Sequence, residues 1–389
     1  MEYIKQENES VKNYKIRLFK NKDLYELTSQ QIADLINKES GDNYCESTYR
    51  KWYKAYAEGV NDTEKELISG DKLLKEYELK QQELQKERYK FFDQRTAYNK
   101  NLRNDARWDN LKEILTKSIK EIKPYLNKNY DNIQYQDNDL LVGLNDLHFG
   151  IEINNYWNKY NPDIAKERLE KYIKEIISIQ KTHSSENCYI CANGDLISGN
   201  SHLTIALANR ENVVEQVMGV SELFSWFISE LSGYFKNIYF SVVAGNHSRL
   251  SLKDNSPKNE RLDDLVPFYI KARLQNLKNV EVIDNNIDNT MSLINIRGLN
   301  YLGVHGDMDN MGNILKLVEM LPNKVYGILF GHLHHNVSDS TQGYKLLMSG
   351  SLMGIDDFCI EKRIMGKPQQ LVCVCDNKGV RAMYDVIFH

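Results

Sequence analysis

From Asp137 to His389, short apolar runs alternate with longer amphipathic stretches. The apolar runs lead into a Gly, Asn or Asp and cover residues 140–144, 189–192, 238–243 and 325–330. Runs of this kind are typical of strands buried on both faces. Helical periodicity lies between them, over residues 163–180, 209–231 and 310–320. The pattern predicts a layered α/β domain over residues 137–389.

Residues 1–60 carry two shorter helical patterns. The stretch from Thr28 to Asn37 begins with N-cap candidates and continues with apolar residues at helical spacing. Gly41 ends it, and residues 46–56 predict a second helix. Two short helices joined through a glycine turn resemble a helix-turn-helix.

The second of these helices is basic. It carries Arg50, Lys51 and Lys54 on a side expected to face solvent, as a recognition helix does. Trp52 is expected to pack into the core of the helix pair. DNA is therefore an expected partner. The alternative is a helical hairpin that only packs on its neighbours.

Residues 61–124 predict one long helix that ends at Pro124. Apolar residues recur every seven positions, at Tyr77, Leu84, Phe91 and Tyr98. This spacing is typical of a coiled-coil seam. Polar residues at the other seam positions weaken the prediction: Gln81, Arg88 and Arg95. The seam is therefore expected to form a coiled coil, or to pack on the α/β domain or on a second copy of the chain.

The composition fits a globular protein, with 41% hydrophobic and 27% charged residues in 389. The net charge of −4 excludes a polycation. No apolar stretch is long enough for a membrane span, and the polar N-terminus lacks the apolar region of a signal peptide, so a cytoplasmic protein is expected. Cys188 and Cys191 form a C-x-x-C within a predicted strand, where they point to opposite faces and cannot share a metal ion.

Five polar clusters follow the predicted strands. In chain order they are Asp146-Leu147-His148, Gly194-Asp195, Gly245-Asn246-His247, His305-Gly306-Asp307 and Gly331-His332-Leu333-His334. The carboxyl ends of strands are where α/β folds collect functional groups. Each cluster alone is also explained by a turn or by a buried, hydrogen-bonded histidine. The complete ordered set favours a metal centre instead.

The spacing and the donor types favour a dinuclear centre. Asp146 and His148 are two residues apart, as are His332 and His334, so each pair can face one cavity from a strand end. Carboxylate oxygen and imidazole nitrogen together suit Mn, Fe, Zn or Co better than Ca or Mg.

The ordered motifs D-x-H, G-D, G-N-H, H and G-H-x-H resemble the calcineurin-like metallophosphoesterase superfamily over residues 138–389. The resemblance implies two facing mixed β-sheets flanked by helices, preceded in this chain by the small helical region and the long helix. It implies two divalent ions, with manganese expected and iron, zinc or cobalt as alternatives. One ion would be held by Asp146, His148 and His334, the other by Asn246, His305 and His332, with Asp195 bridging both.

The resemblance also implies a reaction. His247 is expected to stay off the metals, face the substrate and protonate the leaving alkoxide. Candidate phosphate-binding residues after the second and third motifs are His202, Arg210 and Arg249. Ser248 stands where many members of the superfamily have an acidic residue, so the group that orients His247 is open. The second motif lacks the arginine-bearing extension of protein Ser/Thr phosphatases, which disfavours phosphoproteins as substrates.

Within the superfamily the chain resembles phage and prophage metallophosphoesterases. The shared stretches include residues 194–199, 209–213, 260–265, 350–352 and 361–363. The leading hypothesis is a DNA nuclease or phosphodiesterase of a phage or prophage. The alternative is a phosphodiesterase or phosphatase for a small, for example cyclic, nucleotide, with a homo-oligomer formed through the long helix. A scaffold without activity is disfavoured by the intact set of ligands.

Overall fold

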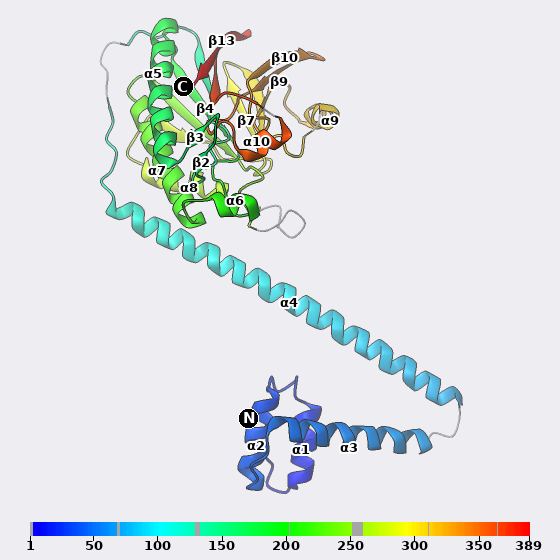
Figure 1. Ribbon diagram of the computed structural model, residues 1–389. Helices are drawn as coiled ribbons and strands as arrows, with labels where there is room; N and C mark the ends of the chain where they lie inside the picture. The colour runs from blue at the N-terminus through cyan, green and yellow to red at the C-terminus, as the bar shows by residue number, and fades with distance from the viewer. Residues whose placement is uncertain are drawn as a thin grey trace. The chain divides into compact units, whose positions relative to one another are not determined.

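The computed structural model describes residues 3–67, 71–128, 133–201, 203–250, 260–309, 311–363 and 365–389. By its internal contacts the chain divides into two compact units, Met1–Asp105 and Ala106–His389 (Figure 1). Among the described helices, none is both long and apolar enough to cross a membrane.

The first unit contains the helices α1 (Val11–Lys20), α2 (Ser29–Ser40) and α3 (Glu46–Leu67). Their shared core comprises Tyr14, Leu18, Ile32, Ala33, Ile36 and Tyr49. The predicted start of α2 is confirmed, because Thr28 and Gln31 form a reciprocal capping box. Gly41 ends α2 with a left-handed φ of 72°. The sequence interpretation missed α1, of whose residues only Tyr14 and Leu18 are buried.

The expectation for Trp52 was wrong, because the core residue of α3 is Tyr49. Tyr49 is buried, and its hydroxyl donates a hydrogen bond to Asn37 Oδ1 at 2.7 Å. Trp52 lies three residues later, which turns it by about 60° around the helix. It is only half-buried and stacks on Tyr56, with ring centroids 5.8 Å apart.

Arg50, Lys51 and Lys54 are exposed on α3, as predicted. Arg50 lies 3.8 Å from Glu46, and Lys54 lies 3.9 Å from Glu58. Exposed pairs of this kind contribute little to stability, so the basic side chains remain available to a partner. A third helix, α1, packs with the pair, and the DNA-binding helix-turn-helix stays a prediction.

The long helix α4 (Asp71–Glu121) ends before Pro124, as predicted. Residues 68–70 of the predicted single helix lie outside the described residues. The side chains of the heptad seam, Tyr77, Leu84, Phe91 and Tyr98, are between 48% and 70% exposed. Two of the polar seam positions are paired within the first unit, Arg88 with Asp23 and Arg95 with Glu26.

The second unit is built on two facing β-sheets, so the predicted fold class is confirmed. The six-stranded sheet has the order β13 (Gly379–Ile387), β12 (Gln369–Asp376), β1 (Asp139–Gly143), β4 (Asn187–Asn193), β5 (Asn237–Val243) and β6 (Val280–Val282). The five-stranded sheet has the order β10 (Val337–Thr341), β11 (Tyr344–Met348), β9 (Val325–Phe330), β8 (Leu299–Val304) and β7 (Met291–Ile296). Both are mixed: β1, β4, β5 and β6 run parallel, as do β8, β9 and β11.

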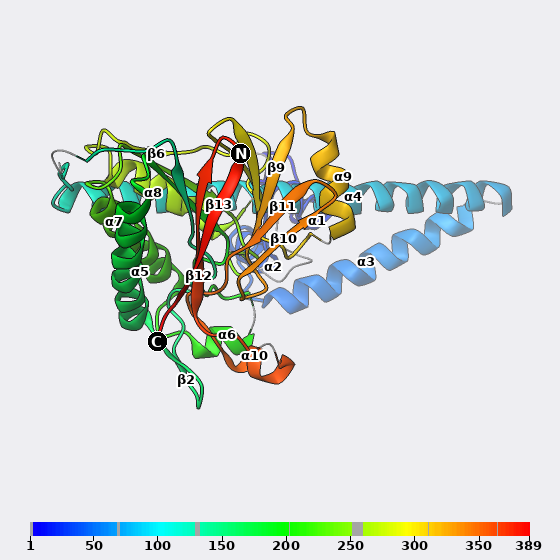
Figure 2. The same cartoon turned by 90° about the horizontal axis from the view of Figure 1, so that it is seen from above.

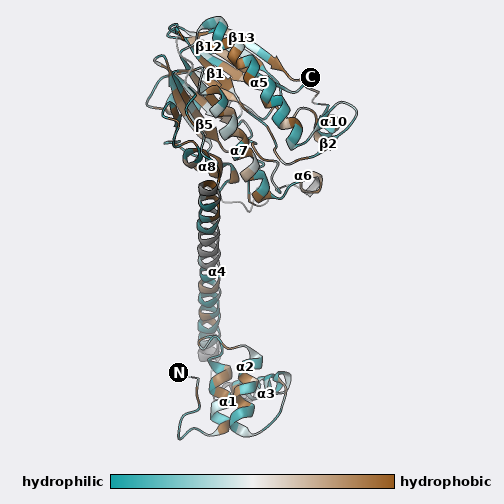
Figure 3. Ribbon diagram, turned by 90° about the vertical axis from the view of Figure 1, so that its left-hand side faces the viewer, coloured by the Kyte–Doolittle hydropathy of each residue, from teal (hydrophilic) through white to brown (hydrophobic). Residues whose placement is uncertain are grey.

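Helices cover the outer faces of both sheets (Figure 2). The helices α5 (Pro162–His183), α7 (Val213–Leu231) and α8 (Leu265–Arg273) pack on the six-stranded sheet, and α9 (Met311–Met320) packs on the five-stranded sheet. The strands of this unit are mainly brown in Figure 3, whereas α5 carries both teal and brown residues, as expected for buried strands and an amphipathic helix. Smaller elements complete the unit: β2 (Ile153–Asn154), β3 (Lys159–Tyr160), α6 (Leu203–Ala208), a 3-10 turn (Leu262–Asp264) and α10 (Asp357–Lys362).

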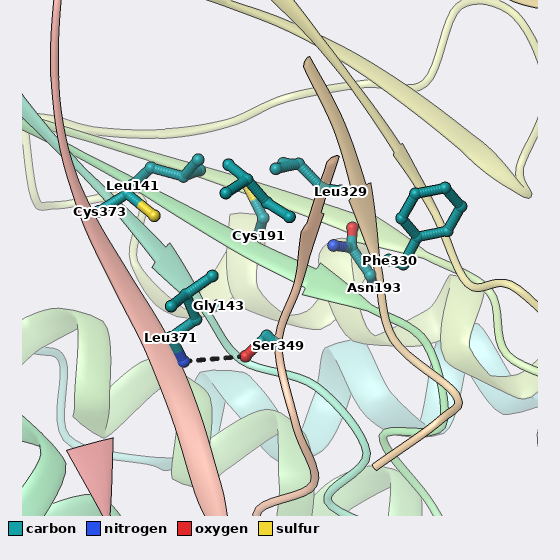
Figure 4. A pocket seen from close by; sticks show the side chains of 10 residues that line it. Leu141, Gly143, Cys191, Asn193, Leu329, Phe330, Ser349, Leu371 and Cys373 are labelled. Atoms are coloured by element: carbon teal, nitrogen blue, oxygen red, sulfur yellow. Dashed lines mark hydrogen bonds between the residues drawn. The ribbon is translucent and has the colours of Figure 1, made fainter. Parts of the chain in front are cut away.

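The space between the sheets is filled by side chains. Leu141, Cys191, Leu329 and Leu371 belong to this inner core, and the cavity among them measures only about 20 Å³ (Figure 4). Such a volume admits at most a water molecule, so this is no ligand site. Cys191 faces the inner core and Cys188 the outer one, which confirms that the two thiols of the C-x-x-C point to opposite faces.

The buried side-chain amide of Asn145 joins the two sheets at the carboxyl ends of β4 and β9. Asn145 donates from Nδ2 to Phe330 O at 3.0 Å, and its Oδ1 accepts from Asn193 N at 2.8 Å. Its backbone exchanges two hydrogen bonds of 2.9 Å with the Gln370 side chain. Gln370 Nε2 also donates to Gly350 O at 2.7 Å. The ends of β1, β4, β9 and β12 are thereby fixed to one another.

We expect Gln370→Leu to destabilise the fold by about 3–5 kcal/mol, because it leaves the buried N–H of Asn145 and the buried carbonyl of Gly350 without partners at about 1–3 kcal/mol each. Chemical denaturation measures this loss. Gln180→Leu is a matched control, since Gln180 is also buried but its side chain donates one long hydrogen bond of 3.3 Å, to Ser185 O. Equal losses in both variants would contradict the role of Gln370.

Candidate metal centre

All seven side chains predicted as metal ligands come together where the strands end. Asp146 and His148 follow β1, Asp195 follows β4, Asn246 follows β5, His305 follows β8, and His332 and His334 follow β9. The carboxyl ends of parallel strands meet at one edge of a sheet, and the two sheets face each other. The parallel runs of both sheets therefore deliver these loops to one place.

The backbone at these ligands adopts an unusual conformation. Five of the seven have a positive φ: Asp146 (52°), His148 (45°), Asp195 (51°), His332 (68°) and His334 (57°). Residues with a side chain rarely occupy this region, and they keep it only where the surroundings hold them there. Hydrogen bonds between the loops do so: Asp146 N donates to Gly194 O at 3.2 Å and His148 N to Asp195 O at 3.0 Å. Such a concentration of backbone strain is typical of a functional site.

Two glycines allow the loops to approach one another closely. A Cβ on Gly245 would lie 2.1 Å from Asp195 N and 2.2 Å from Asp195 Oδ1. Gly194 has a φ of +90°, and its Cβ would lie 2.5 Å from His305 Nδ1. The glycines in the second and third motifs are therefore required by the packing of the ligands, because any side chain there would displace them.

The ligating atoms form overlapping clusters. Those of Asp146, His148 and His334 lie within 4.8 Å of one another, and so do those of Asp195, His305 and His332. In the second cluster His305 Nε2 lies 3.1 Å from both Asp195 Oδ2 and Asn246 Oδ1. His148 Nε2 lies 4.0 Å from Asp195 Oδ2, which connects the clusters. Asp195 is thus placed between the two groups of ligands.

Two buried atoms in the first cluster fit a bound cation. Asp146 Oδ1 and His148 Nε2 are buried and have no hydrogen-bond partner among the described residues. Leaving such atoms unpartnered costs stability, and coordination to a cation would satisfy both. Burial raises the pKa of Asp146 well above its usual range, so the protein alone does not supply enough positive charge to this carboxyl.

The protonation of the histidines agrees with a metal-binding role. Burial lowers the pKa of His148 and His332, and it lowers the pKa of His334 to about 4. These imidazoles are therefore neutral near pH 7, which is the form that binds metals. Burial acts against a charge on His305 as well, but the Asp195 carboxylate raises the pKa of His305 to about 10. Without a cation, His305 thus serves as the positive partner of Asp195.

His247 lies beside the first cluster and is held by two hydrogen bonds. Its backbone N–H donates to Asp195 Oδ1 at 2.8 Å, and its Nδ1 lies 3.0 Å from the carbonyl oxygen of Ser198. With Nδ1 donating to Ser198, Nε2 faces the cluster, 3.9 Å from Asp195 Oδ2. The group that orients His247 is therefore a backbone carbonyl. Ser248 instead caps the local turn by donating from Oγ to Gly245 O at 2.9 Å.

Two of the candidate phosphate-binding residues, Arg249 and Arg210, differ in burial and in their acidic partner. Arg249 is buried, and its Nη2 donates to Asp307 Oδ2 at 2.6 Å, which ties the third motif to the fourth. Arg210 is half-exposed and lies 3.3 Å from Asp163. His202 lies outside the described residues.

Sequence reasoning missed several residues that shape the centre. Asn145 acts through its buried side-chain amide and Ser198 through its backbone carbonyl, and neither belongs to the motif residues predicted as ligands. Asp263 accepts from Gly245 N at 3.0 Å, and burial raises the pKa of Asp263 to about 7. The signal that could have found it is the charged stretch of residues 260–265, which carries Arg261, Asp263 and Asp264 just before a helix.

The chain is similar to proteins of prophage origin. Residues 1–68 match a family model described as the YonJ N-terminal domain, and residues 80–122 match one described as the YonJ coiled-coil domain. A curated relative is the SPbeta prophage-derived uncharacterized protein YonJ of Bacillus subtilis (strain 168). It is 26% identical over 402 aligned positions, which cover 98% of this chain and 97% of the relative.

Solved structures similar to this chain include an archaeal phosphodiesterase, a Vps29 and a predicted phosphoesterase. An archaeal phosphodiesterase is 12% identical, covers 64% of this chain and 99% of its own, and has a TM-score of 0.34. Vps29 of Entamoeba histolytica complexed with zinc is 11% identical, with 63% of this chain and 98% of Vps29 covered and a TM-score of 0.31. A conserved protein of Streptococcus pneumoniae TIGR4, described as a predicted phosphoesterase, is 9% identical, with 64% of this chain and 99% of that protein covered and a TM-score of 0.27. At such low TM-scores these likenesses add nothing to the strand order described above.

We expect Asp195→Asn to weaken Mn²⁺ binding at both clusters, by at least about 100-fold, because the charge shared by both is lost. His334→Ala should impair only the first cluster and retain about half of the bound metal. Both variants should lose metal-dependent hydrolysis. Metal content after dialysis, measured by mass spectrometry, tests this, with Asp284→Asn as a surface control. Full metal content and activity in Asp195→Asn would overturn the assignment.

Proposed function

We propose that this chain is a metal-dependent phosphoesterase that hydrolyses phosphodiester bonds with two divalent ions. The observation that supports this most is the pair of neighbouring clusters, which a third group of ligand atoms, from His148, Asp195 and His247, connects. Two cations bound close together polarise a phosphoryl group and lower the pKa of water, which is the chemistry that phosphoester hydrolysis requires. The strained loops and the unpartnered Asp146 Oδ1 support the same function.

The residues divide into two ligand groups. Asp146, His148 and His334 hold one ion, and Asn246, His305 and His332 hold the other. Asp195 contributes to both. This donor set of oxygen and nitrogen atoms suits Mn²⁺, with iron, zinc and cobalt as alternatives. His305 would have to lose the proton that pairs it with Asp195 in order to hold an ion, so metal uptake by this group would release a proton.

His247 supplies the proton for the leaving group. Its Nδ1 is engaged by Ser198 O, which leaves Nε2 as the atom directed at the centre. Proton transfer to a developing alkoxide by a positioned imidazole contributes about 10²–10⁴-fold to the rate. Since His247 Nε2 is also near Asp195, a ligand role is the competing assignment, and the two differ in metal content when His247 is removed.

DNA is the proposed substrate, and the chain acts on it as a nuclease or phosphodiesterase in the cytoplasm. Three features support this choice: the exposed Arg50, Lys51 and Lys54 on α3, the separate helical unit that carries them, and the similarity to a prophage-derived relative. The exposed heptad seam of α4, in a region matching a family model described as a coiled coil, supports a homo-oligomer formed through this helix.

A small, for example cyclic, nucleotide is the competing substrate. A pocket of about 270 Å³ adjoins the ligand loops and is lined mainly by apolar side chains. It includes Gly306, Gly331 and Leu333, which are neighbours of His305, His332 and His334 in the chain. A nucleobase is apolar on its faces and would fit such a surface. Incubation of the pure protein with Mn²⁺ and single-stranded DNA, duplex DNA or cyclic nucleotides distinguishes the two substrates. The absence of hydrolysis in the whole panel would contradict the proposed function.

We expect His247→Ala to keep its metal ions and to lose about 10²–10⁴-fold in turnover on esters with poor leaving groups. A nitrophenyl ester should lose much less, because its leaving group needs no proton. Steady-state kinetics on both esters, together with metal analysis, measures this. An equal loss on both esters would argue against proton donation, and loss of a metal ion would favour the ligand role.

We expect a triple Arg50/Lys51/Lys54→Ala variant to bind DNA more weakly regardless of sequence. The slope of log affinity against log salt should flatten by about 0.9 for each phosphate of duplex DNA that no longer has a basic partner. Hydrolysis of a small ester should be unchanged, because the metal ligands belong to the other unit. Unchanged DNA affinity and salt slope would reject this role of α3 and favour the small nucleotide.

A further inference from the structure

One buried arginine beside the candidate metal centre has side-chain donors without a hydrogen-bond partner among the described residues. Arg261 is 5% exposed, and its Nε and Nη1 have no hydrogen-bond partner among the described residues. An unpaired buried guanidinium is costly, since it loses water and gains nothing in return. Arg273 shows how a buried guanidinium is usually paired. It is equally buried, but it donates from Nε and Nη2 to Glu222 at 2.8 and 2.9 Å and from Nη1 to Lys123 O at 2.8 Å.

The backbone places Arg261 directly opposite Arg249. The two residues form an antiparallel bridge, and Leu262 N donates to Ser248 O at 2.9 Å beside it. Residues opposite each other in such a bridge have their side chains on the same face, and like charges in this position repel. Arg249 reaches Asp307, so the side chain of Arg261 lies on the face that is turned toward the loop carrying His305.

The acidic groups nearby favour the charge of Arg261, but none of them accepts a hydrogen bond from its Nε or Nη1 among the described residues. Asp307 accepts from Arg249, Asp263 accepts from Gly245 N, and Asp264 accepts from Asn289 Nδ2 at 2.9 Å. Burial, together with the charge of Arg249, lowers the pKa of Arg261, and the carboxylates of Asp307, Asp263 and Asp264 act in the opposite direction without reversing this shift. The Arg261 guanidinium therefore keeps two N–H donors that no described carboxylate occupies.

We propose that Arg261, with Arg249, forms a binding site for a phosphate group of the substrate. A guanidinium offers paired N–H donors that match two oxygens of a phosphate. Arg249 follows His247 by two residues and Asp307 follows His305 by two, so the site adjoins the ligands on the side of the third and fourth motifs. Naming the anion as the substrate's phosphate rests on the proposed function; the anion site itself does not. The phosphate is either the one that reacts or one that flanks it.

The first test uses the full-length protein and inorganic phosphate, in chelator so that no metal ion contributes. At constant ionic strength, phosphate should raise the melting temperature of the wild-type protein by about 2–5 °C more than chloride does. In Arg261→Gln, phosphate should raise the melting temperature no more than chloride does. Arg273→Gln should keep the difference, although its own melting temperature falls by about 5–15 °C because a buried pair is broken.

The same variants test whether Arg261 is merely structural. Since Nε and Nη1 have no partner in the part of the chain that the structure describes, Arg261→Gln should melt at or above the wild-type temperature without ligand. A variant that fails to fold, or melts several degrees lower, would overturn the proposal. So would a phosphate response equal to that of the wild type.

Kinetics then identify the phosphate. With Mn²⁺, Arg261→Gln should lose about 10- to 100-fold in kcat/KM, mainly through KM, and Arg261→Lys should recover part of the loss. The substrates are a nitrophenyl ester of thymidine monophosphate and the same ester with a second phosphate. Equal losses identify the reacting phosphate, and a loss confined to the second ester identifies a flanking one. No loss on either ester would overturn the proposal. If the wild-type protein hydrolyses neither, the proposed function fails, while the thermal test still decides whether the anion site exists.

Discussion

The buried side chain of Asn145 holds the two sheets together at the end where the ligand loops converge. It spans from the end of β4 to the end of β9, and Gln370 fixes its backbone from β12. Asp146 is the next residue, so the first candidate ligand is positioned by a network of buried hydrogen bonds. A dinuclear centre needs donors from both sheets within a few ångströms. That requirement can be met only if the sheets cannot slide past each other, and buried, fully satisfied amide hydrogen bonds provide this constraint.

With the sheets fixed, the loops can carry strain and charge that an isolated loop would relax. Asp146, His148 and Asp195 have positive φ and are buried, and Gly194 and Gly245 let the strained segments touch. Each of these features lowers stability by itself. Together they leave a buried carboxylate oxygen and a neutral imidazole nitrogen directed at the same space. The free energy lost in building the loops is recovered when cations bind, so stability and metal binding should be tightly coupled in this unit.

The sequence predicted the strands, the layers and the convergence of the ligands because strand ends in parallel sheets meet regardless of loop detail. It also predicted the start and end of α2, where Thr28 and Gly41 act locally. It failed where the outcome depends on tertiary partners. Tyr49 and Trp52 are both aromatic residues of one helix, and only the packing of α2 decides which of them is buried. Arg249 and Arg261 likewise differ in whether Asp307 reaches them, which no pattern in the sequence states.

The metal ligands explain how a phosphoester could be hydrolysed, but not which one. Any such ester presents the same phosphoryl group to Asp195 and His247, so these residues cannot discriminate between a polymer and a small nucleotide. Discrimination must come from groups beyond the ligands, and the described residues offer three kinds. Arg249 and Arg261 carry a charge complementary to a phosphate, the pocket beside Leu333 is lined mainly by apolar side chains, and the exposed basic side chains of α3 are complementary to an extended polyanion. Binding of a polyanion at α3 would depend most strongly on salt, because it would exchange many counterions at an exposed surface. The salt dependence of binding therefore separates recognition of a polymer by α3 from recognition of a single nucleotide at the centre.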